Sequence, residues 1–139
     1  MDYQILPHLA DLKIKVFGKT KEEIFLNTLK AINEFLKPEI IENQNSKNRE
    51  IKIESIDLTT LFIDFLNEVL YLIQINKESY HDIKFKKFNI LPNKITLEVE
   101  LEGKKVKRFS EDIKAATYHN LEFYQEEDKA WKATVLFDV

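Results

Sequence analysis

The first alternating stretch of the chain, residues 12–17, predicts a half-buried strand. Leu12, Ile14 and Val16 alternate there with Lys13 and Lys15, so that apolar and charged side chains point to opposite faces. Glycine follows directly, at a position where we expect a turn.

The next segment has the signals of a capped helix. Thr20 and Glu23 form a capping-box pattern, in which each side chain accepts a hydrogen bond from a backbone N–H. Apolar residues then recur at helical spacing, and Pro38 ends the pattern because the residue before a proline avoids the α region. The apolar positions are Phe25, Leu29, Ile32, Phe35 and Leu36. A short apolar run and a polar loop are expected over 39–48.

A second helix follows another alternating strand at 49–55. Asp57 is placed to cap this helix, which we expect over 58–75. Its apolar residues form a broad stripe, so it should be the most buried helix of the protein. The stripe consists of Leu58, Leu61, Phe62, Phe65, Leu66, Val69, Leu70 and Ile73.

The remaining segments predict strands. The alternation over 82–91 changes phase at Lys86–Lys87, which indicates a β-bulge, and 94–102 alternates up to Gly103, where a turn is expected. Residues 113–124 and 130–139 flank a polar tip and predict a hairpin. Early helices and late strands together predict an α+β fold: a two-layer single domain over 1–139, with a mostly antiparallel sheet packed on two helices.

Composition excludes several classes of function. The 139 residues include only two glycines and no cysteine, which removes glycine-rich phosphate loops, disulfides and thiolate chemistry. A net charge of −3 does not favour nucleic-acid binding as the main role. The N-terminus does not resemble a signal peptide, and no uninterrupted apolar run reaches ~18 residues. We therefore expect a cytoplasmic protein without membrane association.

Two stretches contain candidate functional residues. His8 and Asp11 precede the first alternating strand, while Lys114, Tyr118 and His119 lie in the predicted hairpin. Periodicity alone favours the simpler interpretation of both, in which Asp11 ends a turn and Lys114 is a solvated charge.

Several motifs nevertheless resemble those of the archease family, in order and at matching spacing. After Tyr3, the segment "HLAD" (8–11) resembles the family's His-Thr-Ala-Asp motif, with leucine in place of threonine. "FLNEVLYL" (65–72) is similar to a family helix pattern, and "IKAATYH" (113–119) to the family's lysine segment. The closing "AWKATVLFDV" (130–139) resembles the family's last strand.

The resemblance implies a role as a protein cofactor. Archeases activate the RtcB-type tRNA-splicing RNA ligase: they promote its GTP-dependent guanylylation and its multiple turnover, and do not join RNA themselves. Lys114 matches a lysine that is functionally important in the family. The expected partner is therefore an RtcB-type RNA ligase, without stable direct binding to nucleic acid.

The resemblance also implies a divalent-metal site, with calcium as the expected cation. Its ligands would be Asp11, Asp138 and Val139, the last through the terminal carboxylate. Three neighbouring carboxylates repel one another, and a hard cation relieves this repulsion.

Two other classes of function remain as alternatives. One is an RNA-binding or chaperone-like module, suggested by basic residues at 84–87 and 104–108 with phenylalanines between them. The other is a metal-dependent hydrolase, for which the sequence offers no second catalytic set.

Overall fold

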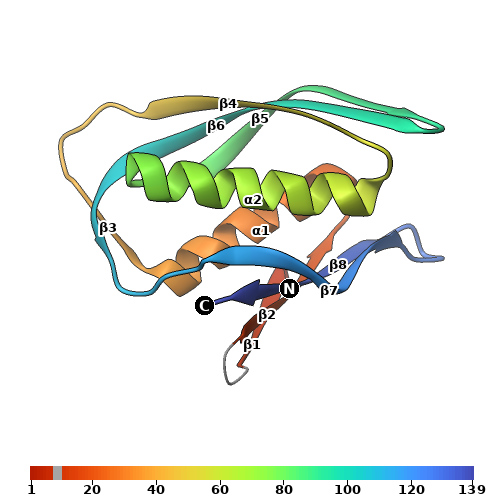
Figure 1. The fold of residues 1–139 in the computed structure, drawn as a ribbon, viewed down its shortest axis with the longest axis horizontal. Helices are drawn as coiled ribbons and strands as arrows, with labels where there is room; N and C mark the ends of the chain where they lie inside the picture. The colour runs from red at the N-terminus through yellow and green to blue at the C-terminus, as the bar shows by residue number, and fades with distance from the viewer. Residues whose placement is uncertain (8–10) are drawn as a thin grey trace.

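Two antiparallel sheets lie on opposite sides of a pair of helices in the computed structural model, which describes residues 1–7 and 11–139 (Figure 1). The first sheet has the order β1-β2-β8-β7, and in the second β6 pairs with β3, β4 and β5. The strands of the first sheet are β1 (Tyr3–Pro7), β2 (Asp11–Gly18), β7 (Ala115–Gln125) and β8 (Trp131–Asp138). Those of the second are β3 (Pro38–Ile40), β4 (Lys47–Ser55), β5 (Glu78–Leu91) and β6 (Lys94–Phe109).

Both helices begin at the caps that the sequence predicts. Thr20 Oγ1 accepts from the N–H of Glu23 at 3.1 Å at the start of α1 (Lys21–Leu36). Asp57 Oδ1 accepts from Thr60 N–H at 2.8 Å at the start of α2 (Leu58–Asn76). Each helix ends at a lysine in the left-handed region, with φ of 49° for Lys37 and 52° for Lys77. The predicted helices are thus confirmed, with ends within about one or two residues.

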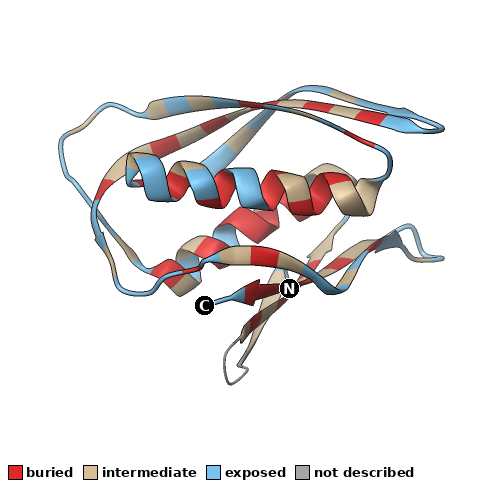
Figure 2. Ribbon diagram, viewed as in Figure 1, coloured by how far each residue is buried: buried red, intermediate tan, exposed pale blue. Residues whose placement is uncertain are grey.

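The helices form the middle of three layers. Helix α1 packs on β2 and β5, and α2 packs on β7 and β4, so each helix touches both sheets. The α+β class and the antiparallel pairing are as predicted, but the expected single sheet is divided into two. Alternation shows that one face of a strand is buried, and it does not show which strands share a sheet. Figure 2 shows buried residues along both helices and, interspersed with more exposed ones, along the strands of both sheets.

The core is centred on the ring of Phe25 from α1. Five other aromatic rings have centroids 5.0 to 6.2 Å from it. Helix α2 is apolar and long enough, by length and composition alone, to cross a membrane. In the structure its predicted stripe packs against this core, which is the behaviour of a core helix. The five rings belong to Phe62, Phe65, Phe85, Phe88 and Phe123.

The structure corrects the predicted strands in three places. Gly103 lies inside β6 and makes no turn: a Cβ there would lie 2.4 Å from the backbone oxygen of Ser79, so only glycine permits the close approach of β5. Strand β5 starts at Glu78, earlier than the expected residue 82, and the short strand β1 was not predicted. The bulge between Phe85 and Lys87 is confirmed.

Candidate functional site

Two carboxylates lie directly opposite each other where β2 begins and β8 ends. Asp11 pairs with Asp138 in the antiparallel ladder, and the next pair, Leu12 with Phe137, is buried toward the helices. Because side chains alternate along a strand, both aspartates point to the opposite, outer face of the sheet. Directly opposed residues have Cβ atoms roughly 4.5–5.5 Å apart, and like charges in such pairs destabilise the sheet.

The predicted lysine segment reaches the same point from the other side of β8. Ala115 of β7 pairs with Asp138, and the N–H of Lys114 donates to the backbone oxygen of Asp138 at 2.8 Å. Val139 follows Asp138 and is 38% exposed. The structure therefore brings together Asp11, Asp138, Val139 and the backbone of Lys114, which the sequence places at opposite ends of the chain.

The donor groups here suit a hard cation. Among residues 1–7 and 11–139, no three His, Cys, Asp or Glu side chains gather into a metal site. Asp11 and Asp138 are nevertheless directly opposite each other in the ladder, and Val139 follows Asp138 in the chain. Calcium, magnesium and manganese bind such oxygen donors, and water completes their coordination at an exposed site.

The segments that build this end of the sheet are those that carry the family motifs. The profile of the Archease protein family (MTH1598/TM1083) matches residues 3–139. The chain belongs to the archease family.

Relatives and solved structures agree with this membership. A protein archease of Methanosarcina barkeri is 32% identical, over 99% of this chain and 95% of the relative. That of Pyrococcus furiosus is 29% identical, over 95% of this chain and 94% of the relative. The solution structure of protein 1598 of Methanobacterium thermoautotrophicum superposes with a TM-score of 0.76 at 26% identity, over 99% and 98% of the two chains.

A second solved structure supports the fold alone. It is described as an archease, possible chaperone, from Thermotoga maritima. It superposes with a TM-score of 0.69 at 22% identity, and the match covers 96% of this chain and 94% of that one.

The histidines do not join the site in the part of the chain that the structure describes. His8 lies outside the described residues. His119 is exposed in the part of β7 where pairing with β8 is interrupted, between Thr117 and Glu122. His81 is exposed on β5 in the other sheet.

Several of the basic residues of β5 and β6 have partners within the protein. Lys86 pairs with Glu100 at 3.1 Å, and its neighbour Lys87 approaches Glu98 at 4.0 Å. The phenylalanines between these lysines face inward, with the rings of Phe85 and Phe88 packed around the core ring of α1. Bases therefore cannot stack on them. Further along, Lys105 Nζ donates to the backbone oxygen of Asn76 at 2.7 Å, and Arg108 pairs with Glu39.

An ion pair between the half-exposed Arg49 and the buried Glu78 is structural. The side chain of Glu78 has no exposed surface, and Arg49 donates to both of its oxygens, at 2.9 and 2.8 Å. The hydroxyl of Tyr80 donates to Glu78 at 2.7 Å. Hydrogen bonding to Arg49 lowers the pKa of Glu78, and burial is the main reason why the pKa of Tyr80 is raised to about 12. Groups with shifted pKa values can mark a functional site, but here Glu78, Arg49 and Tyr80 hydrogen-bond one another within the sheet.

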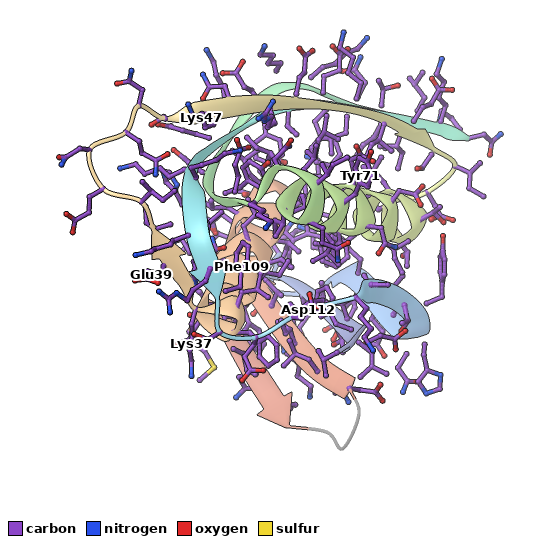
Figure 3. The ribbon with its side chains drawn as sticks, turned by 60° about the vertical axis from the view of Figure 1, so that its left-hand side comes forward. Lys37, Glu39, Lys47, Tyr71, Phe109 and Asp112 are labelled. Atoms are coloured by element: carbon purple, nitrogen blue, oxygen red, sulfur yellow. The ribbon has the colours of Figure 1, made fainter. Side chains whose placement is uncertain are left out.

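Two residues that the sequence did not indicate as functional contact the lysine segment. Asn67 and Gln74 of α2 hydrogen-bond the backbone at Ala116 and Ile113, on either side of Lys114. Asn67 lies within "FLNEVLYL" (65–72), which resembles the family's helix pattern, but that pattern gave no role to the amide. The sequence signal of Gln74 is its position alone, about two helical turns after Asn67 on the flank of the apolar stripe. Figure 3 shows the connection at Asp112 passing below α2, the helix that carries Tyr71.

Proposed function

We propose that this protein activates an RtcB-type tRNA-splicing RNA ligase, by promoting its GTP-dependent guanylylation and multiple turnover. Membership of the archease family supports the proposal. The structural observation that supports it most directly is that Asp11, Asp138 and Lys114 lie together at one exposed end of a sheet. The protein would act as a cofactor of the ligase and not as an enzyme. Its partner would be the ligase itself, met in the cytoplasm.

The second part of the proposal is a divalent cation, calcium, held by Asp11, Asp138 and the carboxylate of Val139. The opposed aspartates on β2 and β8 support it, because their repulsion disfavours the sheet unless positive charge lies between them. When bound, the cation would neutralise these carboxylates and fix the end of β8. The strand pairing would then present Lys114 at a defined distance from it.

Lys114 is the residue that we expect to act on the ligase. Its ammonium makes no ion pair within the described residues, and its side chain is exposed. A lysine carries a compact charge on a flexible four-carbon stem, so it can reach a phosphate on a separate molecule. The group that it contacts would be either the phosphate of the bound nucleotide or the guanylylation site of the ligase.

A multiple-turnover ligation assay tests the proposal. The protein is mixed with RNA alone, with nucleotide alone, and with a purified RtcB-type ligase plus both substrates. Only the third mixture should respond, with a higher turnover number for the ligase. A response to RNA alone would favour the RNA-binding alternative, and no response in any mixture would reject the assignment.

Lys114→Ala supplies the decisive variant, with Lys84→Ala as its matched control. Both lysines are exposed, and Lys84 lies on β5 in the other sheet. Surface substitutions of this kind usually change the free energy of unfolding by less than ~0.5 kcal/mol. We expect Lys114→Ala to lose most of the stimulation at an unchanged melting temperature, while Lys84→Ala keeps it. The reverse pattern would move the function to the basic face of the second sheet.

A further inference from the structure

Two amide side chains of α2 hold the backbone on both sides of Lys114. Asn67 Oδ1 accepts from the N–H of Ala116 at 2.8 Å, and Asn67 Nδ2 donates to the oxygen of Ala116 at 3.2 Å. Gln74 Nε2 donates to the oxygen of Ile113 at 3.1 Å. Between these contacts, Lys114 N–H donates to Asp138. The backbone of the lysine is thus fixed between α2 on one side and β8 on the other.

Asn67 hydrogen-bonds the open edge of β7 in the way that a neighbouring strand would. β7 is the terminal strand of its sheet, so one side of its backbone has no strand partner. Unpaired N–H and C=O groups of an edge strand must find other partners or water. The amide of Asn67 offers one donor and one acceptor to the same residue, Ala116, and so closes this edge of the sheet.

The ladder between β7 and β8 is too short to fix the segment alone. Pairing covers Ala115–Thr117, is then interrupted, and resumes only at Glu122. Lys114 lies just before the first of these pairs, at the position where a short ladder frays most easily. Ile113, only 1% exposed, anchors the segment in the core, and the amide contacts from α2 flank the lysine between this anchor and Ala116.

We propose that Asn67 and Gln74 are positioning residues that hold Lys114 at Asp138. The inference rests on the proposed role of Lys114 in activating the ligase. A misplacement of about 1 Å can cost on the order of a hundredfold in rate, so the two amides would matter without touching ligase, nucleotide or cation.

The first arm of the test uses the protein by itself. Amide hydrogen exchange is measured by NMR at Lys114 and Ala116 in the wild type, Asn67→Leu, Asn67→Asp and Gln74→Met. Leucine and methionine keep most of the side-chain volume without the amide. We expect exchange at Ala116 to rise roughly tenfold in Asn67→Leu, since one net hydrogen bond is worth about that factor. Asn67→Asp keeps the accepting oxygen and should lie in between.

The matched control for this arm is Asn89→Leu. Asn89 is an exposed asparagine of β5 in the other sheet, opposite Thr96. The same substitution there should leave exchange at Lys114 and Ala116 at the wild-type rate. Wild-type exchange in Asn67→Leu as well would overturn the inference, whatever the ligase does.

The second arm measures ligase guanylylation against the concentration of each variant. Loss of positioning should lower the maximal stimulation, on the order of tenfold for Asn67→Leu, with little change in the half-saturating concentration. A merely structural defect lowers the folded fraction and so raises the half-saturating concentration with an unchanged maximum. That pattern would overturn the inference, as would wild-type stimulation by a variant whose exchange is fast.

The two arms separate this inference from the function on which it rests. If the wild-type protein does not stimulate the ligase, the proposed function fails. The exchange data then still decide whether the two amides hold the lysine segment.

Discussion

Replacing Asp138 by asparagine should stabilise the protein without metal and remove most of its stabilisation by calcium. Asparagine has nearly the same volume as aspartate but no charge. The change therefore relieves the repulsion with Asp11, which lies directly opposite on β2. The same change removes one anionic ligand of the proposed cation site. A gain of stability without metal and a loss of stabilisation by calcium, both from one substitution, would be specific to an aspartate that repels Asp11 and binds the cation.

The magnitudes follow from the strand pairing. Like charges directly opposed on antiparallel strands cost about 0.2–1 kcal/mol, so Asp138→Asn should raise the free energy of unfolding by that amount in a chelator. For a domain of this size 1 kcal/mol shifts the melting temperature by roughly 4 °C. Calcium at a hundredfold excess over its dissociation constant stabilises the wild type by about 2.7 kcal/mol, or roughly 10 °C. The order of the two melting temperatures should therefore reverse when calcium is added.

Thermal melts followed by circular dichroism measure both effects. Wild type, Asp138→Asn and the control Asp112→Asn are melted in chelator and across a calcium titration. Asp112 is also exposed and makes no ion pair within the described residues, so its variant should behave like the wild type. Raising the salt concentration should shrink the gain of Asp138→Asn in chelator, because salt screens exposed charges.

Two results would refute this reasoning. An Asp138→Asn variant that is no more stable than the wild type in chelator shows that the opposed aspartates do not repel. A variant that gains as much from calcium as the wild type shows that Asp138 is not a ligand.

Three further predictions concern the chain end and the second sheet. A tag after Val139 should impair calcium binding and ligase activation while a tag before Met1 does not, as calorimetry and ligation would show; equal behaviour would remove the Val139 carboxylate from the site. Arg49→Ala should cost about 3–5 kcal/mol in denaturant melts, because the buried Glu78 carboxylate loses its main partner. The pKa of Glu78 is lowered in the folded protein, so its contribution is present above the ordinary glutamate pKa and lost as the pH falls through the folded value. Wild-type stability should thus fall more steeply with acid than that of Arg49→Ala; parallel curves would contradict the pairing. Gly103→Ala should destabilise by about 1–3 kcal/mol through the clash with Ser79, and an unchanged melting temperature would show that β5 can move away.

Local signals were enough to predict the helices and one irregular strand. The caps at Thr20 and Asp57 are properties of a few neighbouring residues, and so is the phase change that marks the bulge before Lys87. Gly103 shows where local reasoning fails. Glycine is compatible with both a turn and a close approach, and only the position of β5 decides between them.

The candidate site, too, could be predicted from the sequence only in part. The family motifs indicated Asp11, Asp138, Val139 and Lys114 as residues, and the strand register supplies the reason why they meet. The motif "FLNEVLYL" included Asn67, but its contact with Ala116 could not be predicted, because the contact depends on which flank of α2 lies against the open edge of β7. That relation arises from the packing of the layers and has no counterpart in the periodicity of either segment.

The central claim, activation of a ligase through this end of the sheet, is tested most directly by the transfer of labelled guanylate from GTP to an RtcB-type ligase. The initial rate is followed with no addition, with the wild-type protein, and with Lys114→Ala. We expect the wild type to raise the rate and Lys114→Ala to leave it near the rate of the ligase alone. The same rate in all three reactions would contradict activation of the ligase by this protein.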